Sequence, residues 1–266
     1  MTPKTERAEI ATKPVVYQIP GMDEVTIQRD IPYQITDAGP LGLDLYSPPD
    51  SKAGARMPAV IFVTGYSDLG AEKFLRCKLK EMECYISWAK LVAASGLRAI
   101  TYLNHTPARD LDELFRYIRE NAEVLGIDER RIGVWSCSGN VPLALDVLMR
   151  EPIRCAALCY GVTLDLDGST NVAESAKKFG FANPASGKSV RDLPPELPLF
   201  IARAGRDEPG LNKTMDHFIA HALAANLPIT VANHATGPHA FDVLHDSEAS
   251  REIIRQILAF LRLHLA

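Results

Sequence analysis

The chain has 266 residues, of which 47% are hydrophobic and 23% are charged, and its formal net charge is −4. This composition excludes a disordered chain and a small disulfide framework, and the length suits one large α/β domain. The small negative charge, with no run of lysine or arginine, argues against nucleic acid and against a basic membrane-surface patch as partners.

The N-terminal residues 1–14 are charged and lack the apolar core of a secretory signal, so we expect a loose leader. No uncharged apolar run reaches the roughly 18 residues of a membrane span. The five cysteines are an odd number scattered over the chain, which favours reduced thiols. We therefore expect a cytoplasmic protein. Both a monomer and a homo-oligomer are compatible with the sequence.

Apolar runs bounded by turn residues predict the strands. Short edge strands, expected to be antiparallel, are predicted at residues 15–18, 25–28 and 42–46. The apolar run at residues 59–63 is typical of a central strand buried on both faces, and further strands are predicted at residues 97–103, 132–135, 155–160, 198–204 and 228–233.

Helical periodicity fills most of the intervals between these strands. Helices are predicted before Gly96, from Pro107 to Ala122, and over residues 141–149, 211–225 and 247–265. Residues 161–193 fit no regular element, and we interpret 162–191 as either a small cap or a surface loop insertion. Strand–helix alternation predicts one domain with a mostly parallel sheet of about eight strands and helices on both faces.

The segment 131–142 predicts a strand, a sharp turn and a helix, with Ser138 at the apex of the turn. Such a turn exposes the serine hydroxyl, and the helix N-terminus behind it offers free N–H groups to a negative charge. Cys137 is an alternative thiol nucleophile, but Gly139 follows Ser138 and places Ser138 at the apex. Ser136 and Asn140 occupy the flanking positions where glycine is common.

Two further candidate residues follow strands of the same predicted sheet. Asp207 comes after the strand that ends near residue 204, and His239 comes after the last strand. Function in open α/β sheets collects at the carboxyl ends of the strands, so Ser138, Asp207 and His239 are predicted to form a triad of nucleophile, acid and base. Glu208 is the rival acid, and Asp242 is expected to anchor the histidine loop.

Four segments carry a family resemblance: Pro-Ala-Val-Ile-Phe-Val-Thr-Gly, Arg-Ile-Gly-Val-Trp-Ser-Cys-Ser-Gly, Ala-Arg-Ala-Gly-Arg-Asp and Gly-Pro-His-Ala-Phe-Asp. Over about residues 40–264 the chain resembles the α/β-hydrolase superfamily, most closely its dienelactone-hydrolase-like branch. True dienelactone hydrolases use a cysteine nucleophile where this chain has Ser138, so dienelactone is not the expected substrate. Gly139 and Tyr66 are the expected main-chain oxyanion donors.

The predicted function is a serine hydrolase, a carboxylesterase that cleaves small or medium esters through an acyl-enzyme. Alternatives are a cutinase-like polyesterase or lipase, a triad enzyme for amides or carbon–carbon bonds, and a binding protein on a hydrolase scaffold. No glycine-rich phosphate or dinucleotide loop is present, so no cofactor is predicted, and no metal is expected. The candidate pocket residues are Gly65, Trp135, Phe179, Phe181 and Phe241.

Overall fold

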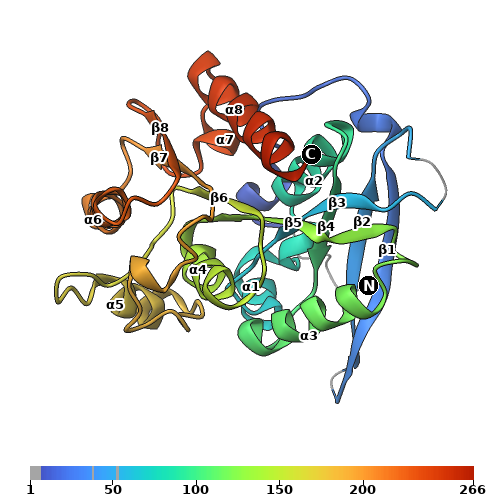
Figure 1. The fold of residues 1–266 in the computed structure, drawn as a ribbon, viewed down its shortest axis with the longest axis horizontal. Coiled ribbons are helices and arrows are strands. Elements are labelled where there is room, and N and C mark those ends of the chain that lie inside the picture. Colours follow the sequence, from blue (N-terminus) through green and yellow to red (C-terminus); the bar gives the residue numbers. More distant parts are fainter. Residues whose placement is uncertain (1–6, 38, 52–53) are drawn as a thin grey trace.

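The computed structural model describes residues 7–37, 39–51 and 54–266, and its described strands form one eight-stranded sheet (Figure 1). The strand order is β1-β2-β4-β3-β5-β6-β7-β8. The pairs β1/β2 and β2/β4 are antiparallel, and every pair from β4 to β8 is parallel. The strands are β1 (Thr26–Thr36), β2 (Gly39–Ser47), β3 (Met57–Phe62), β4 (Arg98–Tyr102), β5 (Ile127–Cys137), β6 (Cys155–Cys159), β7 (Leu199–Ala204) and β8 (Ile229–His234). The predicted mostly parallel sheet is confirmed.

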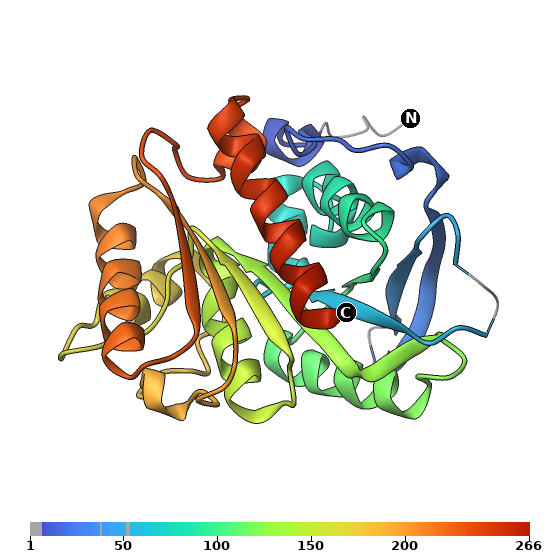
Figure 2. The ribbon, with the colours of Figure 1, turned by 45° about the horizontal axis from the view of Figure 1, so that its top comes forward.

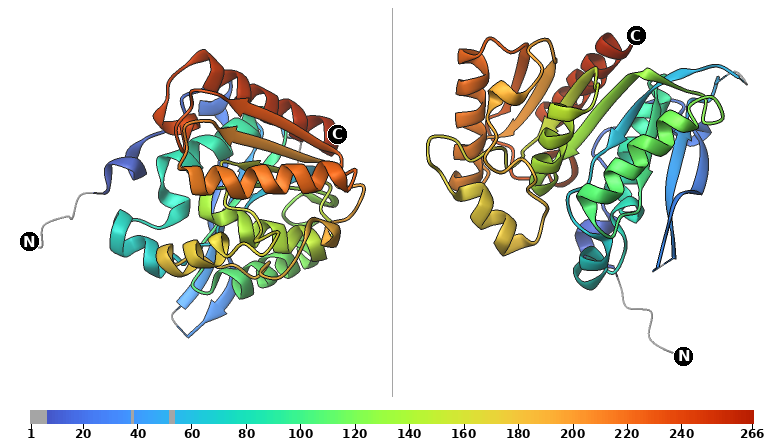
Figure 3. Two further views of the ribbon diagram at one scale, coloured as in Figure 1. Left: turned by 90° about the vertical axis from the view of Figure 1, so that its left-hand side faces the viewer. Right: turned by 60° about the horizontal axis from the view of Figure 1, so that its bottom comes forward.

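Helices cover both faces of the sheet (Figure 2). One apolar cluster contains side chains of α3, α4 and α6, and a second, on the opposite face, contains side chains of α2 and α8. In the right-hand view of Figure 3, α3 and α4 lie side by side across the front of the sheet. The helices are α1 (Asp68–Leu75), α2 (Glu83–Ala94), α3 (Pro107–Glu120), α4 (Val141–Arg150), α5 (Asn171–Phe179), α6 (Pro209–Ala224), α7 (Phe241–Leu244) and α8 (Glu248–Leu265).

Central strand β3 shows how one apolar run supplies buried side chains to both faces of the sheet. Ala59 and Ile61 belong to the cluster under α3 and α4, whereas Val60 and Phe62 belong to the cluster under α2 and α8. Successive side chains of a strand point to opposite faces, so a run of uninterrupted apolar residues buries both. This arrangement leaves the carboxyl ends of the strands and their loops to carry polar groups.

The N-terminal segment is packed where the structure describes it, contrary to the expected loose leader. Ala11 is fully buried, and the Ala8 N–H donates to the Leu75 carbonyl at 3.1 Å. The strand predicted at 15–18 is wrong, because the Val15 N–H donates to Ser87 Oγ (2.9 Å) and the Val16 N–H to the Asp242 carbonyl (2.8 Å). These bonds run to α2 and α7 rather than to a neighbouring strand. Residues 1–6 of the predicted leader lie outside the described residues.

The segment 161–193 was predicted to hold no regular element, and this prediction is wrong because it contains α5. The Asp165 carboxylate accepts hydrogen bonds from the Val172 and Ala173 N–H groups, at 2.8 and 2.9 Å. It thereby satisfies two of the free donors at the start of the helix. The stretch predicted as helical before Gly96 is likewise divided into α1 and α2, with Arg76 in the left-handed region (φ 59°) directly after α1.

A buried ion pair joins the β1–β2 hairpin to the short turn Leu79–Glu81 before α2. Lys80, 5% exposed, lies 2.6 Å from both Asp30 and Asp44, and the Asp44 side chain is 2% exposed. Lys80→Met would leave the Asp44 charge buried without its ammonium partner. We expect a loss of about 3–5 kcal/mol in the free energy of unfolding, measured by urea denaturation. The exposed Lys73, changed to Met, should cost less than about 0.5 kcal/mol; equal losses would contradict the ion-pair argument.

Among the helices of the described ranges, none combines the length and hydropathy that crossing a membrane requires.

Candidate active site

The turn after β5 places Ser138 where the sequence predicts it. Strand β5 ends at Cys137, a single turn covers Ser138–Asn140, and α4 follows at once. Ser138 has a φ of 56°, a left-handed value that costs a non-glycine residue on the order of 1–3 kcal/mol. Ser136, in place of the usual glycine, is fully buried, and its hydroxyl donates to the Val63 carbonyl at 3.2 Å. The strand–turn–helix geometry is therefore present without that glycine.

Three side chains from three strand ends form one hydrogen-bonded chain. Ser138 Oγ lies 2.8 Å from His239 Nε2, and His239 Nδ1 lies 2.7 Å from Asp207 Oδ2. The Asp207 side chain is 3% exposed and that of His239 is 37% exposed. With its proton on Nδ1 donated to Asp207, the imidazole leaves Nε2 free to accept the serine proton. The structure thus brings the three predicted residues together.

The rival residues lie in other environments. Glu208 is exposed, and its N–H donates to Asp207 Oδ1 at 2.8 Å, so it supports the acid rather than replacing it. Asp242 is buried and accepts from Trp88 Nε1 (2.7 Å) and from the Tyr160 hydroxyl (2.8 Å), which anchors the histidine loop. Burial raises the pKa of the Asp242 carboxyl. The Asp242 side chain is therefore positioned by Trp88 and Tyr160 rather than by His239.

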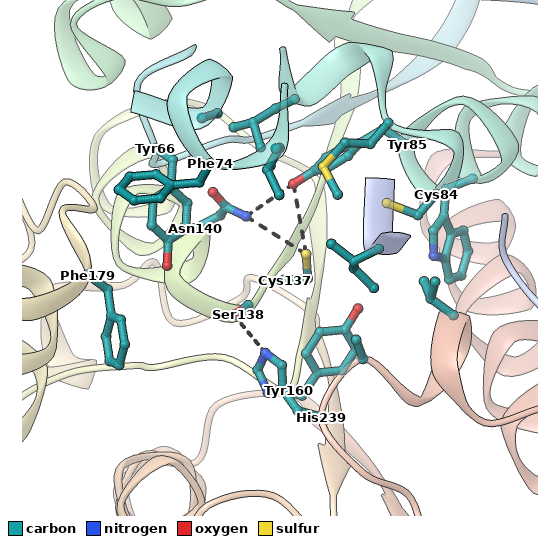
Figure 4. A pocket seen from close by; sticks show the side chains of 18 of the residues that line it. Tyr66, Phe74, Cys84, Tyr85, Cys137, Ser138, Asn140, Tyr160, Phe179 and His239 are labelled. Carbon is teal, nitrogen blue, oxygen red and sulfur yellow. Dashed lines mark hydrogen bonds between the residues drawn. The ribbon is translucent and has the colours of Figure 1, made fainter. Parts of the chain in front are cut away.

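Cys137, the alternative nucleophile, points away from the imidazole (Figure 4). Its sulfur lies 3.9 Å from the Tyr85 hydroxyl and 3.8 Å from Asn140 Nδ2. Burial raises the pKa of the Cys137 thiol to about 12, so it is protonated at neutral pH. Because the thiolate is the reactive form of cysteine, this side chain is a packing residue.

Asn140 connects the serine turn to the loop after β3. Its Oδ1 accepts from the Gly65 N–H at 2.7 Å, and its Nδ2 donates to the Tyr85 hydroxyl at 3.1 Å. A Cβ on Gly65 would lie 3.2 Å from the Asn140 Cα, and one on Gly139 would lie 2.7 Å from a ring carbon of Phe181. The Gly65–Tyr66 loop is therefore held against the turn, an arrangement that the sequence did not reveal.

The two amides expected to bind an oxyanion belong to the two segments that this hydrogen bond joins, Gly139 to the serine turn and Tyr66 to the loop after β3. Within the described residues, neither the Gly139 N–H nor the Tyr66 N–H donates to a protein acceptor. Tyr66 also pairs with Phe181 through an isolated antiparallel bridge, and the Ala182 N–H donates to the Gly65 carbonyl at 2.8 Å. Preorganised main-chain donors of this kind stabilise negative charge that develops on a bound carbonyl oxygen.

Two cavities meet at Ser138 and His239. The first, of about 460 Å³, is largely apolar and extends toward α1 and α2 (Figure 4). The second, of about 520 Å³, extends toward α5 and α6. Tyr66, Ser138, Phe179 and His239 line both. These volumes lie in the range of small-molecule sites.

The predicted pocket residues divide into two groups. Trp135 lines the first cavity, Phe181 lines the second and Phe179 lines both. The predictions for Gly65 and Phe241 are wrong, because neither is a lining residue of these two cavities. The Gly65 amide is turned to Asn140, as described above. Phe241 is 1% exposed and packs edge-on behind Tyr160, with ring centroids 5.6 Å apart.

Sequence reasoning missed Tyr160, Tyr85 and Phe74 as lining residues. The Tyr160 ring packs edge-on against His239, with centroids 5.0 Å apart, and its hydroxyl is held by Asp242. Tyr160 directly follows β6, so its place at the carboxyl end of a parallel strand was a usable signal. Tyr85 and Phe74 come from α2 and α1, whose positions over the turn depend on tertiary packing.

No arrangement for a metal ion is found in the described part of the chain, where no group of three or more His, Cys, Asp or Glu side chains is suitably placed. His217 and His221, one turn apart on α6, lie near Asp167 instead. His221 Nε2 is 2.9 Å from Asp167 Oδ2, and His217 Nδ1 is 3.8 Å from it. All three side chains are exposed, as expected for a solvated helix face.

The loops that carry Asp207 and His239 are bonded to each other. The Gly205 N–H donates to the His234 carbonyl and the Arg206 N–H to the Gly237 carbonyl, both at 2.9 Å. A Cβ on Gly205 would lie 2.5 Å from the Ala235 carbonyl oxygen and 2.8 Å from its carbon. Because those atoms are backbone, they cannot move aside without displacing the histidine loop.

Gly205→Ala is therefore expected to separate Asp207 from His239 and to lower kcat for the ester hydrolysis that the sequence predicts by about 100-fold, the order of loss for a displacement near 1 Å. Steady-state kinetics with a thermal melt would measure it. Arg206→Ala, which removes an exposed side chain and keeps the main chain, should leave kcat within about twofold. An unchanged kcat in Gly205→Ala would show that the loops do not need this close approach.

The sheet order, the two helical layers and the turn after β5 define the α/β-hydrolase fold. The structure is similar to a thermophilic esterase of the planctomycete Thermogutta terrifontis, with 17% identity, TM-score 0.67 and 96% of each chain covered. It is also similar to a thermostable esterase of Pseudomonas putida, with 15% identity, TM-score 0.69 and 94% and 86% of the two chains covered. At these identities the likeness concerns the fold.

A third similar structure is LAE6, an α/β-hydrolase enzyme from the metagenome of Lake Arreo, Spain. It has 18% identity and a TM-score of 0.65, over 91% of this chain and 87% of that one. No protein-family model matches the chain, and no curated protein matches it in sequence.

Proposed function

We propose that the chain is a serine hydrolase of the carboxylesterase type, in a serine-nucleophile group near the dienelactone-hydrolase-like branch. The observation that carries the proposal is the hydrogen-bonded series Ser138, His239 and Asp207, in which Ser138 lies on the strained turn directly before Gly139. The similar solved structures named as esterases support it. The Thermogutta enzyme has been solved with propionate and with butyrate bound, which favours an acyl group as ligand here.

The chemistry follows from the positions of the protons. Ser138 Oγ attacks the ester carbonyl as His239 Nε2 takes its proton, and the oxyanion is bound by the Gly139 and Tyr66 N–H groups. Each such donor contributes on the order of 3 kcal/mol to transition-state stabilisation. His239 then protonates the leaving alcohol. Water, deprotonated by the same nitrogen, cleaves the acyl-enzyme and releases the acid.

We also propose one catalytic domain over residues 1–266, a small-molecule ester as partner and a cytoplasmic location. Residues 162–191 act as a small cap segment, because they supply Phe179 and Phe181 to the two cavities. The alternative of a binding protein without turnover is disfavoured by the hydrogen bond between Ser138 and His239. A scaffold that had lost catalysis would not need the nucleophile and base in contact.

Reaction with a fluorophosphonate, followed by mass spectrometry, tests the proposal on the full chain. We expect the label on Ser138, and we expect Ser138→Ala to lower kcat for p-nitrophenyl butyrate by more than about 1,000-fold. The similar Thermogutta esterase has been solved phosphoramylated by tabun, which supports this choice of reagent. Cys137→Ala is the matched control and should keep the label. A label elsewhere, or turnover that survives in Ser138→Ala, would overturn the proposal.

A further inference from the structure

The two cavities at Ser138 differ in chemistry. Aliphatic and aromatic side chains of α1, of the Leu79–Glu81 turn, of the residue after that turn and of α2 line the first: Ala71, Phe74, Leu75, Leu79, Met82 and Tyr85. Polar and charged side chains of α5 and α6 and of the loop before α6 are frequent in the second: Asn171, Glu174, Ser175, Lys178, Glu208 and Thr214. Because Ser138 lines both, a carbonyl attacked by its hydroxyl directs one substituent into each cavity.

The polar groups at the base of the apolar cavity have protein partners. Asp242 accepts from Trp88 and Tyr160, and the Asn140 amide bonds Gly65 and Tyr85. A substituent that enters this cavity therefore gains from burial of its own carbon atoms. At its mouth Phe74 is 81% exposed and Phe179 is 53% exposed (Figure 4), so the apolar surface continues beyond the enclosed part and can contact a chain of several carbons.

The second cavity suits a hydroxyl-bearing arm. Glu174 and Lys178 lie one turn apart on α5, and Asp207 and Glu208, before α6, line the same cavity. An anionic arm would be repelled by these carboxylates, whereas a carboxylate and an ammonium group can each bond a hydroxyl group. Lys178 Nζ also lies 4.8 Å above the Phe179 ring centroid, at the boundary of the two cavities.

We propose that the substrate is an ester with one aliphatic arm of medium length and one short, hydroxyl-bearing arm, and that the two arms occupy the apolar and polar cavities respectively. This inference rests on the proposed ester hydrolysis and adds the substrate class. The linings of the two cavities support this substrate proposal, because the cavities meet at the hydrogen-bonded Ser138 and His239.

Two substrate series test the proposal and read out which arm is the acyl group. Glycerol monoesters from acetate to octanoate lengthen the acyl arm, and alkyl glycolates from methyl to octyl lengthen the alcohol arm. In one series kcat/KM should rise about fourfold for each added methylene, as expected for burial of a methylene group. At equal length of the aliphatic arm, glycerol esters should also exceed propyl esters, or glycolates should exceed propionates, in kcat/KM.

Three variants test whether the gain in kcat/KM with chain length arises in the apolar cavity. Ala71→Phe fills the apolar cavity and should remove most of the gain in kcat/KM from the shortest to the longest substrate. Phe74→Ser, at an exposed position that tolerates exchange, should reduce the gain only for the longest chains. Leu69→Phe adds a similar ring on the same helix, where Leu69 is 51% exposed and outside both linings, and should leave the gain unchanged.

The failures of the two proposals are distinguishable. If Ser138 takes the fluorophosphonate and p-nitrophenyl acetate is turned over, but kcat/KM is flat with chain length in both series, the substrate proposal is wrong and the esterase proposal stands. The same holds if Ala71→Phe and Leu69→Phe have equal effects. If Ser138 takes no label and no ester is cleaved, both proposals are wrong.

Discussion

Asp207→Asn is expected to lower kcat for ester hydrolysis by about 10⁴-fold, the loss seen when the same change is made in another Ser-His-Asp enzyme. The 2.7 Å contact between Asp207 and His239 Nδ1 requires an acceptor that keeps the proton on Nδ1. An asparagine amide can present its NH₂ group there, which moves the imidazole proton to Nε2. The ring then faces the Ser138 hydroxyl with a donor and cannot accept its proton.

The measurement is kcat with p-nitrophenyl butyrate, together with the rate of fluorophosphonate labelling. Glu208→Gln is the matched control because it changes the adjacent carboxylate and keeps the N–H that bonds Asp207. Because p-nitrophenyl butyrate has no hydroxyl-bearing arm for Glu208 to bond, we expect kcat of this variant to stay within about twofold of the unmodified protein. If Glu208→Gln were the more damaging change, the assignment of Asp207 as the acid would be wrong.

Asn140→Ala is expected to lower kcat by about 100-fold with little change in KM. The alanine removes the acceptor of the Gly65 N–H, so the loop that carries the Tyr66 amide loses its 2.7 Å attachment to the serine turn. The Tyr66 donor acts on the oxyanion rather than on the neutral ester, and its displacement therefore weakens transition-state binding most. A loss of this size equals the lower bound for removing one oxyanion donor outright.

Tyr85→Phe is the control for Asn140, because it deletes the other partner of the amide and keeps the bond to Gly65. We expect it to change kcat by less than about fivefold. Thermal melts of both variants would show whether each remains folded. A similar fall in kcat for both, or a change in KM alone for Asn140→Ala, would show that the bond to Gly65 does not position the loop.

The parts of the site that the sequence predicted are those with local signals. Ser138, Asp207 and His239 each follow a predicted strand, and the carboxyl ends of parallel strands meet at one edge of a sheet. Asn140 was noted only as a departure from glycine, because its partner Gly65 is 75 residues away. The prediction for Phe241 failed because Ala240 adopts a left-handed φ of 53°, and the chain there turns Phe241 into the core.

The errors in the fold have a similar cause. Helix α5 depends on the Asp165 carboxylate, which lies seven and eight residues before the N–H groups it accepts from, beyond the spacing of a capping motif. The segment near Val16 has the apolar residues of a strand, but the Asp242 carbonyl takes its N–H instead of a neighbouring strand. Patterns of apolar residues predict which positions are buried, but they do not indicate which distant group accepts a hydrogen bond from a backbone N–H.

The bonds from Gly205 to His234 and from Arg206 to Gly237 make the supports of Asp207 and His239 a single platform at the end of β7 and β8. A rigid displacement of that platform leaves the imidazole–carboxylate distance unchanged, and with it the tautomer of His239. Only the separation of Ser138 Oγ from His239 Nε2 then varies. Alignment of the whole triad thereby reduces to one coordinate, the distance between the platform and the serine turn.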